Sequence, residues 1–437
     1  MHLPDVKHSE QSRASLVYAG RCATGWTRCA VVRALAGNPT SLIAHSAQGR
    51  CYSSVMYRVF PLLLLVSMAS SATPAPPQKS FDEVVKQATS ARNGDRPTEA
   101  IELYREAVQM RPSWDEGWLW LGTVLYDQDR FPEAQDAFAY FVAIKTQSGP
   151  AWAMKGLCEF EMRDYAQARK DLQTWGRGGF RGGGDLTEVA AFHWAMLMTL
   201  QGDFVRALYM LADRARQDGE SPPLVEAMGL ASLRMPNLPE DYPSELRERV
   251  WLAGKSAFYA SVHDSARSEE YSHRLLAKYG QQPEVHYLEG THLLFELKPA
   301  EAAQEFRKEL QISPQHAAAM LELARIDIDA GDQAEALSLA RHAAEIDPAN
   351  PDAHHILGRA LLAAGQAKEG SQELEAAERL APENAAIHFH LATAYKQLGR
   401  TQDADREMSM YVSLKKKSLE LDAGERHDAE PPLEAPQ

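Results

Sequence analysis

Apolar residues recur with helical spacing along almost the whole chain from Phe81 onward, and glycines or prolines interrupt them at intervals. Residues three or four positions apart face the same side of an α-helix, so this spacing predicts amphipathic helices. No stretch after Phe81 alternates apolar and polar residues convincingly enough to predict a strand. The pattern therefore indicates an all-α protein.

A proline recurs at a fixed interval in the second half of the chain, because Pro314, Pro348 and Pro382 are each 34 residues apart. A similar helical run precedes each of them. Proline ends such a run because it has no backbone N–H to donate and its ring clashes with the preceding turn. An interval of 34 residues is typical of helix–turn–helix repeats that stack into a solenoid.

The residue types inside these repeats resemble the tetratricopeptide repeat (TPR) family. In that family helix A carries a large residue, Leu-Gly and another large residue, and helix B carries small residues before a closing proline. The clearest matches are Trp118, Leu121, Gly122, Leu125, Ala134 and Phe138; Gly290, Leu293, Ala302, Phe306 and Pro314; Leu357, Gly358, Leu361, Leu374, Ala377 and Pro382; and Leu391, Ala392, Tyr395 and Ala404. The resemblance spans residues 81–417 and implies a right-handed TPR solenoid. It also implies that the glycine or alanine lies where helices A and B cross.

Three prolines between residues 236 and 243 interrupt the helical pattern and predict a break between two blocks of repeats. The N-terminal block covers residues 81–235, where we count four repeats. The C-terminal block covers residues 244–417, where we count three clear repeats and one degenerate repeat. Residues 418–437 are acidic, contain prolines and offer little apolar surface, so we expect a disordered tail.

The segment at residues 56–72 has the pattern of a secretory signal peptide, with Arg58, an apolar run and small residues up to Ala72. The apolar run is shorter than the roughly 20 residues that span a bilayer, and a proline-rich linker at 73–80 follows. We therefore expect an exported protein, periplasmic or secreted, whose translation starts at Met56. Residues 1–55 would then not belong to the mature protein. The alternative is that they are real and that the apolar run is a buried or anchoring segment.

Charge is distributed unevenly along the chain. The formal net charge is −14, and because residues 1–55 carry about +4, the remainder carries about −18. An acidic body repels nucleic-acid phosphates, so a nucleic-acid partner is not expected. Three of the four cysteines lie in the first 55 residues, and Cys158, left alone, is expected to be a buried thiol.

Motifs for catalysis or cofactor binding are missing from the sequence. Neither Gly-x-Ser-x-Gly nor His-Glu-x-x-His occurs. The glycine-rich stretch at 176–184 lacks the lysine and the preceding strand of a phosphate-binding loop. We interpret it as a flexible loop between repeats, and the alternative is that Arg177, Phe180 and Arg181 protrude from it and contact a partner. We expect no catalytic residue and no cofactor.

Three histidines, His286, His354 and His388, occupy the same early position of helix A in different repeats. Equivalent residues of adjacent repeats lie roughly 10 Å apart, the spacing of packed helices, whereas zinc holds its nitrogen ligands at about 2.0–2.1 Å. The position normally takes a packing aromatic residue. We therefore expect these histidines to have a packing role and predict no metal site.

The TPR resemblance implies a concave groove lined by the A helices, which binds extended segments of other proteins. In the C-terminal block the groove would carry Tyr287, Thr291, Leu321, Arg325, His355, Arg359, Phe389, Thr393 and Lys396. Arg325, Arg359 and Lys396 would form a basic ladder that pairs with carboxylates of a bound segment. The asparagines by which chaperone-type TPR proteins grip a C-terminal carboxylate are absent from the matching places, so that function is not implied.

The sequence thus predicts a protein-binding scaffold or adaptor of the bacterial cell envelope. The candidate partner-binding residues are Tyr287, Arg325, Arg359, Phe389 and Lys396, with Arg177, Phe180 and Arg181 on the glycine-rich loop. Two alternatives stay open. The chain could be an accessory subunit or assembly factor of an export or envelope enzyme complex, or an enzyme whose site is assembled from residues far apart in the sequence.

Overall fold

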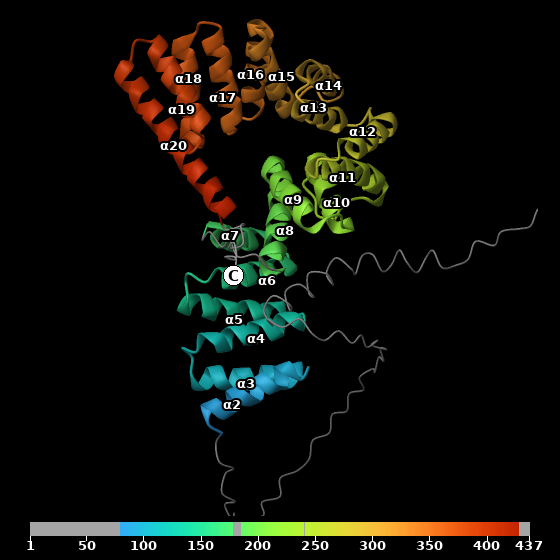
Figure 1. Ribbon diagram of the computed structural model, residues 1–437, viewed down its shortest axis with the longest axis vertical. Coiled ribbons are helices and arrows are strands. Elements are labelled where there is room, and N and C mark those ends of the chain that lie inside the picture. Colours follow the sequence, from blue (N-terminus) through green and yellow to red (C-terminus); the bar gives the residue numbers. More distant parts are fainter. Residues whose placement is uncertain (1–78, 178–184, 240, 428–437) are drawn as a thin grey trace, which may run out of the picture. The chain divides into compact units, whose positions relative to one another are not determined.

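The structure is a computed structural model that describes residues 79–177, 185–239 and 241–427. Helices make up most of the described residues, which contain no strand, and successive helices fold back on each other as hairpins (Figure 1). This confirms the all-α TPR solenoid. We name the first helix of each hairpin helix A and the second helix B. The signal-like segment and Met56 lie outside the described residues.

The helices form two compact units, and each is described by itself. The first unit contains four hairpins, as many as we counted from the sequence. Their helices are α2 (Phe81–Asn93) and α3 (Pro97–Met110), α4 (Asp115–Asp127) and α5 (Phe131–Ile144), α6 (Gly149–Glu161) and α7 (Tyr165–Arg177), and α8 (Asp185–Leu200) and α9 (Phe204–Asp218).

The second unit contains α10 (Pro222–Ser232) from Leu224 onward, a short 3-10 helix η1 (Ser244–Leu246) and five hairpins. The hairpins are α11 (Arg247–Ser261) and α12 (Ser265–Tyr279), α13 (Val285–Phe295) and α14 (Pro299–Ile312), α15 (Ala317–Ala330) and α16 (Gln333–Ile346), α17 (Pro351–Ala363) and α18 (Ala367–Leu380), and α19 (Ala385–Gln397) and α20 (Thr401–His427). Our count of four repeats in this block was one too low.

Helices A and B of each hairpin cross where the repeat pattern places its smallest residue. A Cβ atom added to Gly290 would lie 2.5 Å from the Phe306 ring, and one added to Gly358 would lie 2.6 Å from Leu374. These distances are far below van der Waals contact, so any side chain there would push the helices apart. In the hairpin of α15 and α16 both partners are alanines, Ala324 and Ala340, and both are fully buried. A small pair there replaces the glycine and its large partner, which weakens the sequence signature without changing the crossing.

Helix α10 is tied to α11 by two facing glycines. A Cβ on Gly229 would lie 2.0 Å from the carbonyl oxygen of Val250, and a Cβ on Gly254 would lie 1.9 Å from that of Val225. The backbones of the two helices can approach this closely only because neither residue has a side chain. The compact units consequently divide before Leu224, and the chain crosses between them again at 235–236 and 242–243. The last two crossings flank the proline-rich segment.

The A helices form the tighter layer of the second unit. Helix α15 packs on α17, and α17 packs on α19, in addition to the contacts of each helix with its own partner. No comparably close packing joins helix B of one repeat to helix B of the next among the described residues. A stack whose inner helices touch while its outer helices spread apart is curved, with the A helices on its concave side.

The last helix is longer than expected. Helix α20 continues to His427, whereas we predicted a disordered tail from residue 418. Residues 418–427 contain leucine, glutamate and alanine, which favour helix, and the first proline comes only at Pro431. Among the helices described, none is long and apolar enough to cross a membrane.

Candidate functional site: the helix A face of the second unit

The two arginines of the predicted ladder occupy equivalent positions on successive A helices, α15 and α17. Arg325 is exposed and lies 3.5 Å from Glu322 on its own helix. The guanidinium of Arg359 is largely covered and donates a hydrogen bond to Asp329 of the preceding A helix at 3.2 Å. Both positive charges are therefore partly compensated within the chain, which sequence spacing did not indicate.

Phe389 and Lys396 lie on α19, the last A helix. Phe389 is 42% exposed, and its ring packs 5.4 Å from Tyr411 of α20. Lys396 is exposed. Exposed aromatic rings gain most from burial by a partner, because they offer a large apolar area at a small cost in side-chain entropy.

Two histidines meet on this face although they come from adjacent repeats. Nε2 of His355 lies 2.9 Å from Nδ1 of His390, which also donates to the carbonyl oxygen of Ala386 at 2.7 Å. Burial lowers the pKa of His355 to about 3, assisted by the neighbouring His390 and Arg359. Burial also lowers the pKa of His390. Both rings are therefore neutral at pH 7. They meet because they sit at positions offset by one residue, so the spacing of about 10 Å between equivalent residues does not apply.

Tyr287 belongs to the floor of this face, since its side chain is buried. The ring lies 5.8 Å from that of Phe306 and 4.7 Å from that of His316. Burial raises the pKa of Tyr287 to about 12. Of the five candidate residues on this face, Arg325, Phe389 and Lys396 are exposed, Arg359 is half-buried and Tyr287 is covered.

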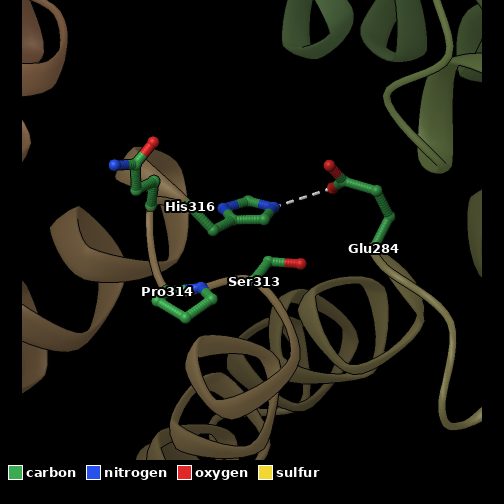
Figure 2. A pocket seen from close by; sticks show the side chains of 5 residues that line it. Glu284, Ser313, Pro314 and His316 are labelled. Carbon is green, nitrogen blue, oxygen red and sulfur yellow. Dashed lines mark hydrogen bonds and ion pairs between the residues drawn. The ribbon is translucent and has the colours of Figure 1, made fainter.

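An open pocket of about 610 Å³ lies beside Tyr287, between the start of α13 and the connection from α14 to α15 (Figure 2). Its wall is held by His316, whose Nδ1 accepts the backbone N–H of Ala319 at 3.0 Å and whose Nε2 donates to the Glu284 carboxylate at 2.8 Å. These two roles fix the tautomer that carries its proton on Nε2. The first hydrogen bond caps the N-terminus of α15.

A buried carboxylate accepts hydrogen bonds from two residues that line the pocket, Glu284 and Ser313. Glu309 on α14 is completely buried and accepts the backbone N–H groups of Glu284 at 2.9 Å and Tyr287 at 3.3 Å. It also accepts the hydroxyl of Ser313 at 3.0 Å. Glu284 has a φ of 72°, a left-handed conformation that is uncommon for a residue with a side chain. The hydrogen bonds to Glu309 and His316 stabilise it in this conformation, and they keep the pocket wall in place.

The three equivalent histidines share one hydrogen-bonding pattern. Nδ1 of His286, His354 and His388 bonds to a glutamate 19 residues later on helix B, at 2.6, 2.7 and 2.8 Å. Nε2 of His354 and His388 bonds to the carbonyl oxygen of the proline that closes the previous repeat, at 3.0 and 2.9 Å. A carbonyl and a carboxylate can only accept, so both ring nitrogens of His354 and of His388 act as donors, and these bonds raise the pKa of the two imidazoles.

The other residues singled out from the sequence lie outside this face. Arg177 is exposed at the end of α7, whereas Phe180 and Arg181 lie outside the described residues. Cys158 is buried, as expected, and burial raises the pKa of its thiol well above the usual range. A thiol of this kind is a packing residue and a poor nucleophile.

Sequence models of the tetratricopeptide repeat match residues 85–150, 263–351 and 357–405, and a second such model matches residues 327–379. The matched segments coincide with hairpins whose A–B crossing has the geometry described above. The chain is a tetratricopeptide-repeat protein. Repeats of this kind mediate contacts between proteins, so the TPR protein is a protein-interaction scaffold.

Solved structures of other helical-repeat proteins resemble the TPR protein weakly. Residues 41 to the end of MamA from Desulfovibrio magneticus RS-1 are 19% identical, with a TM-score of 0.36, over 39% of this chain and 96% of that one. A chain of the APC/C hetero-tetramer Cut9–Hcn1 is 16% identical, with a TM-score of 0.33, over 78% of this chain and 80% of that one. No curated protein matches the sequence.

Sequence reasoning missed Glu284 and Glu309 of the TPR protein. One signal could have revealed Glu309, because the equivalent positions of the next two repeats hold Ala343 and Ala377. A glutamate in a register that otherwise takes a small buried residue must find hydrogen-bond partners inside the protein. Nothing in the sequence identified the partners, because they are backbone N–H groups at the start of α13, and every residue except proline has such a group.

Proposed function

We propose that this TPR protein is a scaffold of the bacterial cell envelope whose second unit holds an extended segment of a partner protein on its helix A face. The observation that carries the proposal is the set of exposed cationic and aromatic side chains on the A helices α15 and α19, Arg325, Phe389 and Lys396. A partner segment with both carboxylates and apolar side chains is complementary to this set. Asp329 is 69% exposed, so an incoming carboxylate can replace it beside Arg359.

Charge reversal on the two faces of the same repeats tests the groove. The first variant combines Arg325→Glu and Arg359→Glu on the A helices. The matched control combines Arg341→Glu and Arg379→Glu, which are exposed on the B helices α16 and α18. Pull-down from envelope fractions with quantitative mass spectrometry should show a partner whose recovery falls at least about tenfold with the first variant, because like charges then face each other. The control should retain it. Equal recovery with both variants would exclude the helix A face as the binding surface.

The envelope location rests on the signal-like segment at residues 56–72. Its own test is N-terminal sequencing of the protein purified from its native source. A mature N-terminus shortly after Ala72 supports export and a start at Met56. A native chain that begins before Met56 contradicts both, and leaves the scaffold function to be judged by the pull-down alone.

A further inference from the structure

The last repeat differs from the others by one acidic residue at its histidine. Relative to His388, His354 and His286, the residue ten positions earlier is Glu378, Ala344 and Leu276. Glu378 lies in the last turn of α18, His388 in the first turn of α19 and Glu407 in α20. One ligand atom from each of these three residues lies within 4.8 Å of the other two. The last repeat thus converts a shared histidine–glutamate pair into a group of three.

The environment of His388 orients it as a ligand. Its Nε2 donates to the Pro382 carbonyl at 2.9 Å, which turns Nδ1 toward the carboxylate of Glu407 at 2.8 Å. Histidines that bind metals characteristically donate their second ring N–H to a backbone carbonyl or a carboxylate in this way. His388 is 2% exposed and Glu407 6% exposed, so water competes weakly for the space between them. Arg406 is exposed, and its Nε donates a hydrogen bond to the other oxygen of Glu407 at 3.3 Å.

We propose that Glu378, His388 and Glu407 form a structural site for a divalent transition-metal ion such as zinc. A neutral imidazole and two carboxylates carry a total charge of −2, which a divalent cation neutralises. One nitrogen and two oxygen ligands suit zinc and its neighbours better than magnesium or calcium, which prefer oxygen alone. On binding, the metal displaces the proton from Nδ1 of His388, and that proton passes to solvent.

Such an ion would join three consecutive helices at the C-terminal end of the solenoid. The final helix of a repeat array has no following repeat to cover it, and α20 exposes Met408, Met410 and Val412. A metal held by α18, α19 and α20 would stabilise the last helix on the preceding ones. From the sequence we predicted a packing role for His388, because equivalent histidines of adjacent repeats lie too far apart to share a metal ion. The proposed ligands are not equivalent histidines: they come from the last repeat and the helix before it.

The test uses the untagged full chain after removal of metals with a chelator. Zinc binding is measured by calorimetry for the native protein, for Glu378→Ala and for Glu373→Gln. Alanine is the natural residue at the equivalent position 344, so the first variant should fold. The second variant breaks the neighbouring histidine–glutamate pair and is the matched control. Glu378→Ala should weaken one zinc site at least about tenfold, and Glu373→Gln should leave that site unchanged.

Two further measurements locate the ion. Cobalt bound in place of zinc should lack the thiolate-to-metal absorption band, because no cysteine is in the group. Zinc should slow hydrogen exchange in α19 and α20 of the native chain but not of the Glu378→Ala variant. Identical zinc affinities and stoichiometries for the two variants would overturn the proposal, as would a native chain that binds no zinc at micromolar concentration.

Discussion

The two units fill one position of the repeat with different side chains. In the first unit, Nε1 of Trp118 donates to the carbonyl oxygen of Pro112 at 2.8 Å, and Nε1 of Trp152 donates to that of Thr146 at 2.9 Å. In the second unit, His354 and His388 donate Nε2 to carbonyl oxygens that also lie six residues earlier. In all four cases the acceptor lies two residues beyond the end of the preceding helix B, where the helix no longer supplies a backbone partner for the carbonyl group.

The comparison teaches that the backbone requires an N–H donor at this position, and that tryptophan and histidine both supply it. Histidine adds a second donor, which pairs with a glutamate on helix B and introduces a charge. Tryptophan supplies a larger apolar surface, and the Trp118 ring stacks on Tyr140 at 4.4 Å. The first unit is therefore held at this joint by apolar contact, and the second by a titratable ion pair.

The largest expected effect concerns the feature that the two units share. Phe138 and Phe306 fill equivalent A–B crossings, beneath Gly122 and Gly290, and both are fully buried. Replacing either by alanine leaves a cavity and should cost about 3–5 kcal/mol of stability in its own unit. Hydrogen exchange of peptides from α4–α5 and α13–α14 measures the loss. If one variant loses less than about 1 kcal/mol, the two crossings are not equivalent.

The stability of the second unit should depend on pH at the repeat position where it has histidine and the first unit has tryptophan. Burial lowers the pKa of His354, but its hydrogen bonds to Glu373 and Pro348 outweigh burial, so the pKa is raised. The stability from this pair is therefore full below the unfolded pKa of about 6.5 and is lost as pH rises through the folded value.

We accordingly expect hydrogen-exchange protection of α17 and α18 to fall as pH rises above about 6.5 and through the folded pKa of His354, which is raised above that unfolded value. The variant His354→Trp keeps an N–H for the carbonyl and removes the titrating group, so it should flatten this dependence. His342→Gln, at an exposed position of α16, is the matched control. An unchanged slope in His354→Trp would show that the ion pair contributes nothing measurable.

The smallest expected effect concerns the turn between helices A and B, which needs a left-handed residue in both units. In the first unit three of the four turns use a polar residue there, Asp129 among them, and in the second unit three of the five turns use glycine, as at Gly331 with φ 87°. Leu297 is the one apolar residue at such a turn among the described hairpins, with φ 61° and a side chain that is 86% exposed. Leu297→Gly should stabilise the second unit by up to about 1 kcal/mol, since relief of about 1–2 kcal/mol of strain exceeds the entropic cost of glycine.

Urea denaturation of Leu297→Gly gives that change in stability, and Gly331→Ala provides the comparison at the equivalent position. The second variant should be destabilised by about 1 kcal/mol, because alanine is strained where glycine is not. A loss of stability in Leu297→Gly would indicate that the exposed leucine makes contacts that offset its strained backbone.

Sequence patterns determined the architecture of this protein, because its contacts are mostly local. The interval from Pro314 to Pro348 set the repeat, and the small residue at Gly290 set the crossing with Phe306, which lies only 16 positions away. Interactions within a hairpin recur at constant separation, so a one-dimensional pattern records them. The exposed groove residues Arg325, Phe389 and Lys396 could be named by the same register, although their role as a binding surface stays a prediction.

Only the tertiary structure decided which side chains of different repeats and helices meet. His355 and His390 lie 35 residues apart, one more than the repeat, and this offset brings their rings together. Glu309 bonds to the backbone at the start of α13, and Glu378 lies close to His388 and Glu407. Both arrangements depend on the angles at which the helices pack. Polar groups become partners within a few ångströms of each other. Sequence periodicity determines the helix face on which a side chain lies, but the packing of the helices determines the distance between side chains of different helices.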